Sequence, residues 1–245
     1  MSGQLRFADS GEAADLAAFL GRLVHYDRAA AVRLQALGGA LGVFGRPPSF
    51  EVLAIRTVRL AVPVATPLDV TVSAGELLES VDEASAEATV PGPVTGPPWT
   101  GVLPPRGGWR QVPGLPGPGA ITQVLAASVA EFRARDEALP AQHRTRSERD
   151  RIGREIWSRT LGDTELPLRV AHAAQSLGFL RPVRATVSAP STASASASAS
   201  AAPGPDPVAL LASGSWLRLR TPYGSVATRR PGAAGGLGAF QVRPV

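Results

Sequence analysis

FEVLAIRTVRLAV, residues Phe50–Val62, is the longest strand signal in this chain. The stretch is rich in Val, Ile and Leu, and its first half is apolar on both faces, which is typical of a strand with a neighbour on each side. Pro63 and Pro67 are expected to close the strand, because proline donates no hydrogen bond to a sheet. The alternating residues 68–72 then predict a further short strand.

The residues before this strand predict a strand, a helix and a hairpin. Residues 4–8 alternate as a short strand, and Asp9 with Glu12 forms a variant of the capping box. Apolar residues follow at the spacing of an amphipathic helix: Leu16, Phe19, Leu20, Leu23 and Val24. Residues 30–37 and 40–44 predict two strands, joined by a tight turn at Gly38-Gly39.

A second capping box, Ser73 with Glu76, begins a short acidic helix after the strands. Residues 1–84 therefore predict an α+β unit, with a mainly antiparallel sheet and a packed helix. Glu76 belongs to an acidic group that could suggest a metal site, but these acids share part of one helix face and favour a solvated surface: Glu76, Glu79, Asp82, Glu83 and Glu87.

Residues 85–118 form a Pro- and Gly-rich connector that contains two tryptophans. A flexible linker needs no tryptophan, so Trp99 and Trp109 are interpreted as structural anchors that pin the connector to a core. Arg106-Gly107-Gly108 allows two readings. It is either an anion-binding loop with Arg106 as a fork, or a tight turn that places Trp109 in the core.

Residues 119–230 predict a helical unit closed by a β-hairpin. Helices are expected at about 119–138, from a cap at Ser147 to Gly162, and from a cap at Thr164 to a Schellman-like stop at Gly178. Strands are expected at 182–188, 216–221 and 226–230, the last two joined by a turn. The Ser-Ala repeat within 190–207 predicts a disordered insertion, and 231–245 a flexible tail.

Four short segments carry a resemblance. They are LRFAD at the start, RTVRL at 56–60, PPRGGW at 104–109, and LGFL at 177–180 together with Trp216. On these residues the chain is similar to a group of conserved hypothetical proteins of actinobacteria. The resemblance implies an actinobacterial source and carries no assigned activity.

The residue types exclude several chemistries. The chain has no Cys, and all 25 basic residues are Arg, so disulfides, thiolate metal sites, Schiff bases and the Lys-containing phosphate loop are excluded. His25, His143 and His172 have no metal-binding spacing. No catalytic residue, metal or cofactor is predicted. The chain shows no signal peptide and no run of about 20 apolar residues, and we expect a cytoplasmic protein without a membrane segment.

Positive charge is concentrated in the second half of the chain. Residues 1–130 hold 9 Arg against 11 acids (9 − 11 = −2), and residues 131–245 hold 16 Arg against 9 acids (16 − 9 = +7). Three helices followed by strands match the order of a winged helix, which predicts phosphate contacts from a helix and a hairpin. The candidate residues are Arg146, Arg149, Arg218, Arg220, Arg229 and Arg230.

Two observations weigh against nucleic-acid binding. The presumed recognition helix is rich in Ala, and Arg149–Arg159 alternate with Glu148, Asp150 and Glu155 as in a salt-bridged helix. The first hypothesis is therefore a non-enzymatic interaction or scaffold protein, with an unknown protein partner or a second copy as its ligand. Nucleic-acid binding is the alternative, and an enzyme whose site is assembled from scattered residues stays open.

Overall fold

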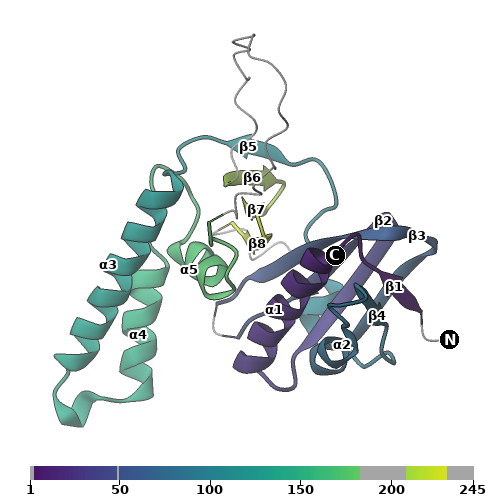
Figure 1. Cartoon of the computed structure of the whole chain (residues 1–245). Coiled ribbons are helices and arrows are strands. Elements are labelled where there is room, and N and C mark those ends of the chain that lie inside the picture. The colour runs from purple at the N-terminus through teal and green to yellow at the C-terminus, as the bar shows by residue number, and fades with distance from the viewer. Residues whose placement is uncertain (1–2, 49, 183–207, 231–245) are drawn as a thin grey trace, which may run out of the picture.

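The computed structural model describes residues 3–48, 50–182 and 208–230, and within them the chain has an α+β fold (Figure 1). The strands are β1 (Gln4–Arg6), β2 (Ala31–Gly45), β3 (Leu53–Ser73), β4 (Glu87–Thr89), β5 (Arg110–Val112), β6 (Ala209–Ser213), β7 (Trp216–Thr221) and β8 (Gly224–Arg229). The helices are α1 (Ser10–Tyr26), α2 (Ala74–Ser80), α3 (Pro118–Glu137), α4 (Arg146–Trp157) and α5 (Leu168–Ser176), with short 3-10 turns η1 (Pro98–Gly101) and η2 (Ala141–His143).

Most strands form one antiparallel sheet of six strands in the order β2-β3-β8-β7-β6-β5, while β1 and β4 pair separately. The predicted strand within β3 is an inner strand, because Ala54 and Ile55 pair with β2 on one side and with β8 on the other. The sheet therefore unites the N-terminal and C-terminal halves of the chain. A single hydrophobic cluster spans both halves, so they pack together.

The caps of the first two helices are confirmed. The Asp9 carboxylate accepts a hydrogen bond from the Glu12 N–H at 2.9 Å, and the Ser73 hydroxyl accepts one from the Glu76 N–H at 3.3 Å. The stop of α5 is confirmed as well. Gly178 has φ +72°, and the Phe179 N–H bonds to the Ala174 carbonyl as a Schellman motif requires.

The predicted hairpin at Gly38-Gly39 is wrong. β2 continues through both glycines, and the positive φ of Gly38, +56°, serves a bulge rather than a turn. The predicted end of the next strand at Pro63 is also wrong, because β3 runs on to Ser73. Between the pairs Ala36↔Leu68 and Ala40↔Arg59, β2 advances four residues and β3 nine (40 − 36 = 4; 68 − 59 = 9). The surplus residues leave the ladder, so the strand tolerates both prolines.

The winged-helix arrangement is wrong too. β7 and β8 form the predicted hairpin, but they are inner strands of the sheet rather than a projecting wing. α3 and α4 lie side by side and extend away from the sheet, whereas α5 packs on β8 (Figure 1). α4 is capped by Thr145 instead of Ser147, and α5 begins after Pro167 instead of Thr164, which forms its own turn.

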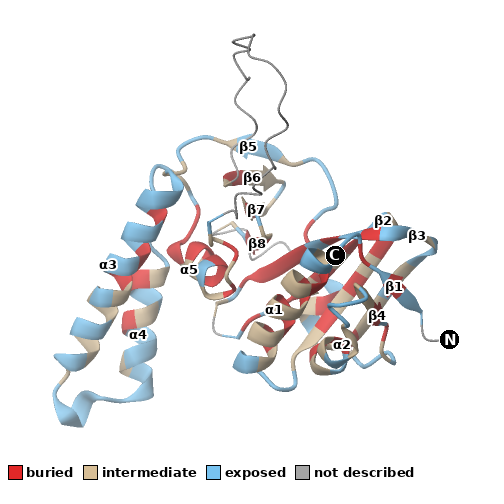
Figure 2. Cartoon of the chain, in the orientation of Figure 1, coloured by how far each residue is buried: buried red, intermediate tan, exposed pale blue. Residues whose placement is uncertain are grey.

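Burial follows the sheet and the inner faces of its helices, while much of the outer part of α3 and α4 is exposed (Figure 2). Among the described residues, no helix is both long and apolar enough to cross a membrane. The predicted strand at 182–188 falls almost entirely outside the described residues, as do the predicted insertion at 190–207 and the predicted tail at 231–245.

Candidate anion-binding pocket

A pocket of about 580 Å³ lies at the corner of the sheet where β3 stops pairing with β8. The last pair between the two strands is Leu53 with Ala227, and β8 continues beyond it to Arg229. β3 begins at Leu53, so the residues before it are no longer part of the sheet. The pocket joins residues far apart in the sequence: Arg46, Glu51, Val52, Leu53, Pro98, Trp99, Val102, Arg169, Trp216, Ala227, Thr228, Arg229 and Arg230. Four of these are arginines, one is a carboxylate and two are tryptophans.

The pocket arginines have weak anionic partners within the described residues. Arg169 lies 3.9 Å from the Glu51 carboxylate, whose side chain is 74% exposed. Arg230 lies 3.5 Å from the Glu165 carboxylate, which is 67% exposed. Both distances reach or exceed the limit of a hydrogen bond, and ion pairs with such exposed groups contribute little. The Nε atoms of Arg169 and Arg230 are buried without a hydrogen-bond partner in the described residues.

The remaining two arginines face the pocket with their positive charge unpaired by any described carboxylate. Arg229 lies over the Trp216 ring, with 5.0 Å between the guanidinium carbon and the ring centroid, and its guanidinium reaches the Ser215 hydroxyl at 3.5 Å. Arg46 makes no ion pair or side-chain hydrogen bond among the described residues. The pocket thus carries an excess of positive charge that an anion would compensate.

Two backbone features accompany this charge. Arg169 is the second residue of α5, where the positive end of the helix dipole disfavours a cation unless an anion lies nearby. Glu51 has φ +53°, a left-handed conformation that costs energy for a residue other than glycine. Strained residues of this kind cluster at functional sites, and Glu51 is the pocket's one carboxylate.

The positive surface continues along β7. Trp216, Arg218 and Arg220 occupy alternate positions and therefore share one face of this strand. Arg218 donates a hydrogen bond from Nε to the Ser225 hydroxyl at 2.8 Å and lies 5.6 Å from the centroid of the Trp109 ring. Burial, together with the charge of Arg220, lowers the pKa of the Arg218 guanidinium.

A second hollow, of about 690 Å³, adjoins the pocket and shares Arg46 and Trp99 with it. Its other lining residues are small or uncharged, apart from Asp27: Ala29, Ala30, Ala31, Pro48, Ser73, Val94, Thr95, Gly96 and Pro97. Arg46 and Trp99 thus border both hollows.

The structure divides the six arginines predicted to bind nucleic acid. Arg229 and Arg230 line the pocket, and Arg218 and Arg220 lie on β7. Arg146 and Arg149 lie at the start of α4, at the end of the α3–α4 pair away from the sheet (Figure 1). The predicted set is therefore split between two separate parts of the molecule.

Arg149 and Arg151 of α4, and Arg159 just after it, bond to carboxylates of α3 and α4. Arg149 bonds to Asp136 at 2.7 Å, and Arg159 bonds to Glu131 at 2.6 Å. Arg146 is 96% exposed and lies 3.9 Å from Asp150. The charges of Arg149, Arg151 and Arg159 are thus compensated as in an ordinary salt-bridged helix, whereas Arg146 is only weakly paired.

The two tryptophans and the glycine motif of the connector lie apart from the core. Trp99 is half-buried and lines both hollows. Trp109 is half-buried as well, and its Nε1–H donates to the Pro105 carbonyl at 3.0 Å, which closes a turn around Arg106–Gly108. The Gly107 carbonyl accepts a hydrogen bond from the Ser213 hydroxyl at 3.2 Å. The expectation that this turn places Trp109 in the core is wrong, because the ring packs at the surface of the sheet.

Sequence reasoning missed Arg46, Arg169 and Trp216 as parts of one site. No local pattern links them. Their separation along the chain exceeds any motif spacing, and the pairing of β3 with β8 brings them together.

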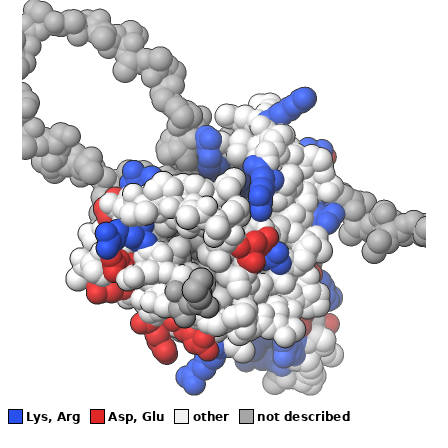
Figure 3. Space-filling model, turned by 90° about the vertical axis from the view of Figure 1, so that its right-hand side faces the viewer, with Lys and Arg blue, Asp and Glu red and all other residues white. Residues whose placement is uncertain are grey.

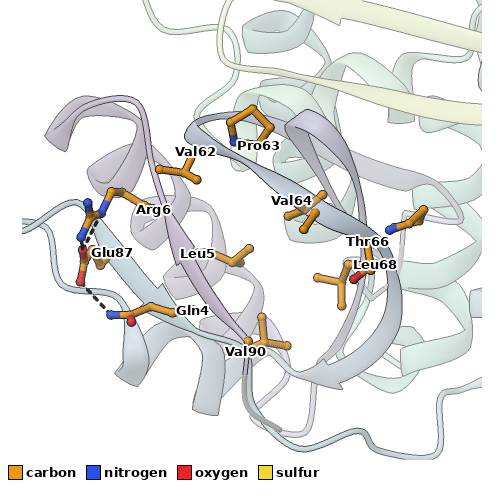
Figure 4. A pocket seen from close by; sticks show the side chains of 13 residues that line it. Gln4, Leu5, Arg6, Val62, Pro63, Val64, Thr66, Leu68, Glu87 and Val90 are labelled. Carbon is orange, nitrogen blue, oxygen red and sulfur yellow. Dashed lines mark hydrogen bonds and ion pairs between the residues drawn. The ribbon is translucent and has the colours of Figure 1, made fainter.

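An apolar hollow of about 440 Å³ lies elsewhere, between β1 and the bulged part of β3 (Figure 4). Leu5, Val64, Leu68 and Val90 line it, and Val62 at its rim is 55% exposed. One side carries Glu87, which accepts hydrogen bonds from Arg6 and Gln4 as drawn in Figure 4. The face of the molecule around β1 and β4 is mostly uncharged, with positive and negative side chains dispersed over it (Figure 3).

Comparison with known proteins gives two matches to family models. Residues 1–101 match a model described as a domain of unknown function (DUF8010), and residues 104–233 match a second, described as a domain of unknown function (DUF8185). No curated protein and no solved structure matches the chain. The boundary between the two models falls inside the connector, and the pocket takes residues from both sides of it.

Proposed function

The chain belongs to the family described as a domain of unknown function (DUF8185), and because that description carries no activity, we propose a function from the pocket itself: the protein binds an anionic ligand there. The observation that carries this proposal is the convergence of four arginines and two tryptophans on one hollow. Their described carboxylate partners are exposed and lie at 3.5 Å or more, so an anion can replace them at small cost.

The lining residues favour binding over catalysis. Glu51 is the only carboxylate among them, they include no His, Ser or Tyr, and the Thr228 hydroxyl is buried and directed at the Arg229 carbonyl. A general base needs a titratable group within reach of a bound substrate. Guanidinium groups, by contrast, are suited to hold phosphate or carboxylate oxygens through paired N–H donors.

Isothermal titration of the full chain with tripolyphosphate, a polyanion that has no ring, tests the proposal. We expect binding at about 50 mM salt that weakens at about 200 mM, because charge-based binding is screened. Arg46→Ala and Arg229→Ala should each lower the affinity about tenfold or more, since a hydrogen bond to a charged group contributes about 1.5–3 kcal/mol. Arg146→Ala removes the same charge outside the pocket and serves as the matched control.

Two outcomes would reject the proposal. One is the absence of measurable heat at low salt with folded protein. The other is an equal loss of affinity in Arg146→Ala and Arg229→Ala, which would mean that the anion responds to net charge and not to the pocket.

The remaining expectations stay predictions. The expected protein partner or homo-oligomer would find apolar surface in the hollow beside β1. The cytoplasmic location and the actinobacterial source likewise rest on sequence and resemblance alone.

A further inference from the structure

We propose that the ligand of this pocket is a single-stranded nucleic acid, whose bases stack on Trp99 and Trp216 and whose phosphates contact the pocket arginines. The inference rests on the proposed function and specifies its ligand class. A ring-free anion would need the arginines alone, and the tryptophans are the observation that points to a ligand with planar rings.

The tryptophans are placed as stacking platforms. Trp99 and Trp216 are both half-buried, so each indole is held by the protein while part of its surface remains open. Trp216 already has the Arg229 guanidinium over its ring at 5.0 Å, which puts a phosphate-binding group beside a base-binding one. Alternation of aromatic and basic side chains in a groove is the pattern by which proteins bind single strands without sequence preference.

The positive surface is also longer than one nucleotide requires. Arg46 and Trp99 also border the second hollow, of about 690 Å³. The positive surface also continues along β7, where Trp216, Arg218 and Arg220 repeat every second residue, about 6.8 Å apart. Trp109 is a third tryptophan beside this strip, because its ring lies near the Arg218 guanidinium. An extended chain of nucleotides suits this strip better than a compact anion does.

A single strand fits better than a duplex. Duplex recognition uses a helix or ribbon that enters a groove. The helix predicted for that role, α5, is largely buried against the sheet, and Arg149 and Arg151 of α4 are paired with acids. The Arg–Trp surface is instead a hollow beside a sheet. Stacking on indole rings requires bases that are free of a partner strand.

The experiment measures fluorescence anisotropy of the full chain with a labelled mixed-sequence strand of about 12 nucleotides and with the duplex of the same sequence. We expect tighter binding of the single strand, with a salt slope that falls by about 0.7 for each pocket arginine removed. Trp216→Ala should lower the single-strand affinity by about 5- to 100-fold, because stacking on one aromatic ring contributes that much. Tripolyphosphate affinity should fall much less than strand affinity in this variant, because tripolyphosphate has no ring to stack and loses only the support that Trp216 gives to Arg229.

Controls separate binding from folding. Trp216→Phe keeps a stacking ring and should recover most of the single-strand affinity. Trp99→Ala removes the ring of the second pocket tryptophan and leaves the arginines in place. Circular dichroism verifies that each variant is folded. Arg146→Ala should bind the strand like the parent protein.

Each alternative result has a definite meaning. Tripolyphosphate binding with no preference for the single strand, or with tryptophan variants that bind the strand normally, would overturn this inference and leave the proposed function in place. Absence of binding to both probes would overturn both. Equal weakening of strand binding by Arg146→Ala and by Arg229→Ala would also overturn the inference, since the strand would then respond to net charge.

Discussion

At the scale of single residues, Arg56 is the most deeply buried charged group in the part of the chain that the structure describes. It is 7% exposed, its guanidinium bonds to the Glu12 carboxylate at 2.8 Å, and it donates to the Tyr223 carbonyl at 2.8 Å. Asp15 lies 3.3 Å away. One side chain on β3 thus connects α1 with the turn between β7 and β8, and therefore the two halves of the chain.

We predict that Arg56→Ala lowers the free energy of unfolding by about 3 kcal/mol, because the Tyr223 carbonyl loses its donor and the buried Glu12 carboxylate loses one of its two arginines. Arg59 still pairs with Glu12, which keeps the loss at the lower end. Urea unfolding measures the effect. Arg151→Ala is the control, since its pair with Glu148 is exposed and should contribute about 0–1 kcal/mol. Equal losses in the two variants would contradict the prediction.

His172 makes stability depend on pH. Its ring stacks on Trp157 with 4.1 Å between centroids, and burial lowers the pKa of His172 below its ordinary value of 6.5. The unfolded chain therefore binds a proton more readily than the folded one does. The contribution of the neutral ring is fully present above about pH 6.5 and is lost as the pH falls below that value.

We therefore expect the free energy of unfolding to decrease between about pH 7.5 and pH 5.5, and we expect His172→Gln to remove most of that decrease. Carboxylates with lowered pKa, such as Glu131 and Glu155, contribute at lower pH and are shared by both proteins. An identical pH dependence in parent and variant would show that His172 is not the titrating group.

At the scale of elements, the connector before β5 is held by contacts at the sheet surface instead of by burial in the core. Trp109 is half-buried, with one hydrogen bond to Pro105 and one contact with Arg218. Its role as an anchor is therefore limited to the turn that leads into β5 and to the adjoining face of β7.

We predict that Trp109→Ala costs about 1–2 kcal/mol, well below the roughly 3–5 kcal/mol of a buried aromatic residue. Phe19→Ala is the comparison, because Phe19 is 1% exposed and belongs to the shared core. Thermal and urea unfolding of both variants provide the test. A loss for Trp109→Ala as large as that for Phe19→Ala would mean that the connector is anchored more deeply than its exposure indicates.

At the scale of the whole molecule, the two family models describe segments that share one sheet and one core. β3 from the first segment pairs with β8 from the second, and residues of both line the candidate pocket. The boundary between the two family models, at residues 101–104, is therefore a boundary in sequence and does not divide the chain into two structural domains.

We predict that residues 1–101 expressed alone do not unfold cooperatively, because β3 would expose its edge and the cluster would lose the part contributed by α5, β7 and β8. Co-expression with residues 104–245 should restore a cooperative transition. Circular dichroism during heating measures this, and a sharp transition for residues 1–101 alone would contradict the shared-core account.

Local features could be predicted from the sequence because their causes lie within a few residues. The cap at Asp9, the stop at Gly178 and the apolar spacing of α1 and α3 each depend on neighbours that are at most one helical turn apart. The concentration of arginine in the second half of the chain was equally visible. Part of the candidate site, Arg229 and Arg230, was found on that basis.

Only the tertiary structure decided how those pieces combine. Gly38 and Pro63 are ordinary turn signals by themselves, and they belong to continuous strands because the β2–β3 ladder continues on both sides of the bulge. Arg46, Trp99, Arg169 and Trp216 become neighbours through strand pairing and packing across the whole chain. Such contacts depend on complementary edges and apolar faces far apart in sequence, and no local propensity records them.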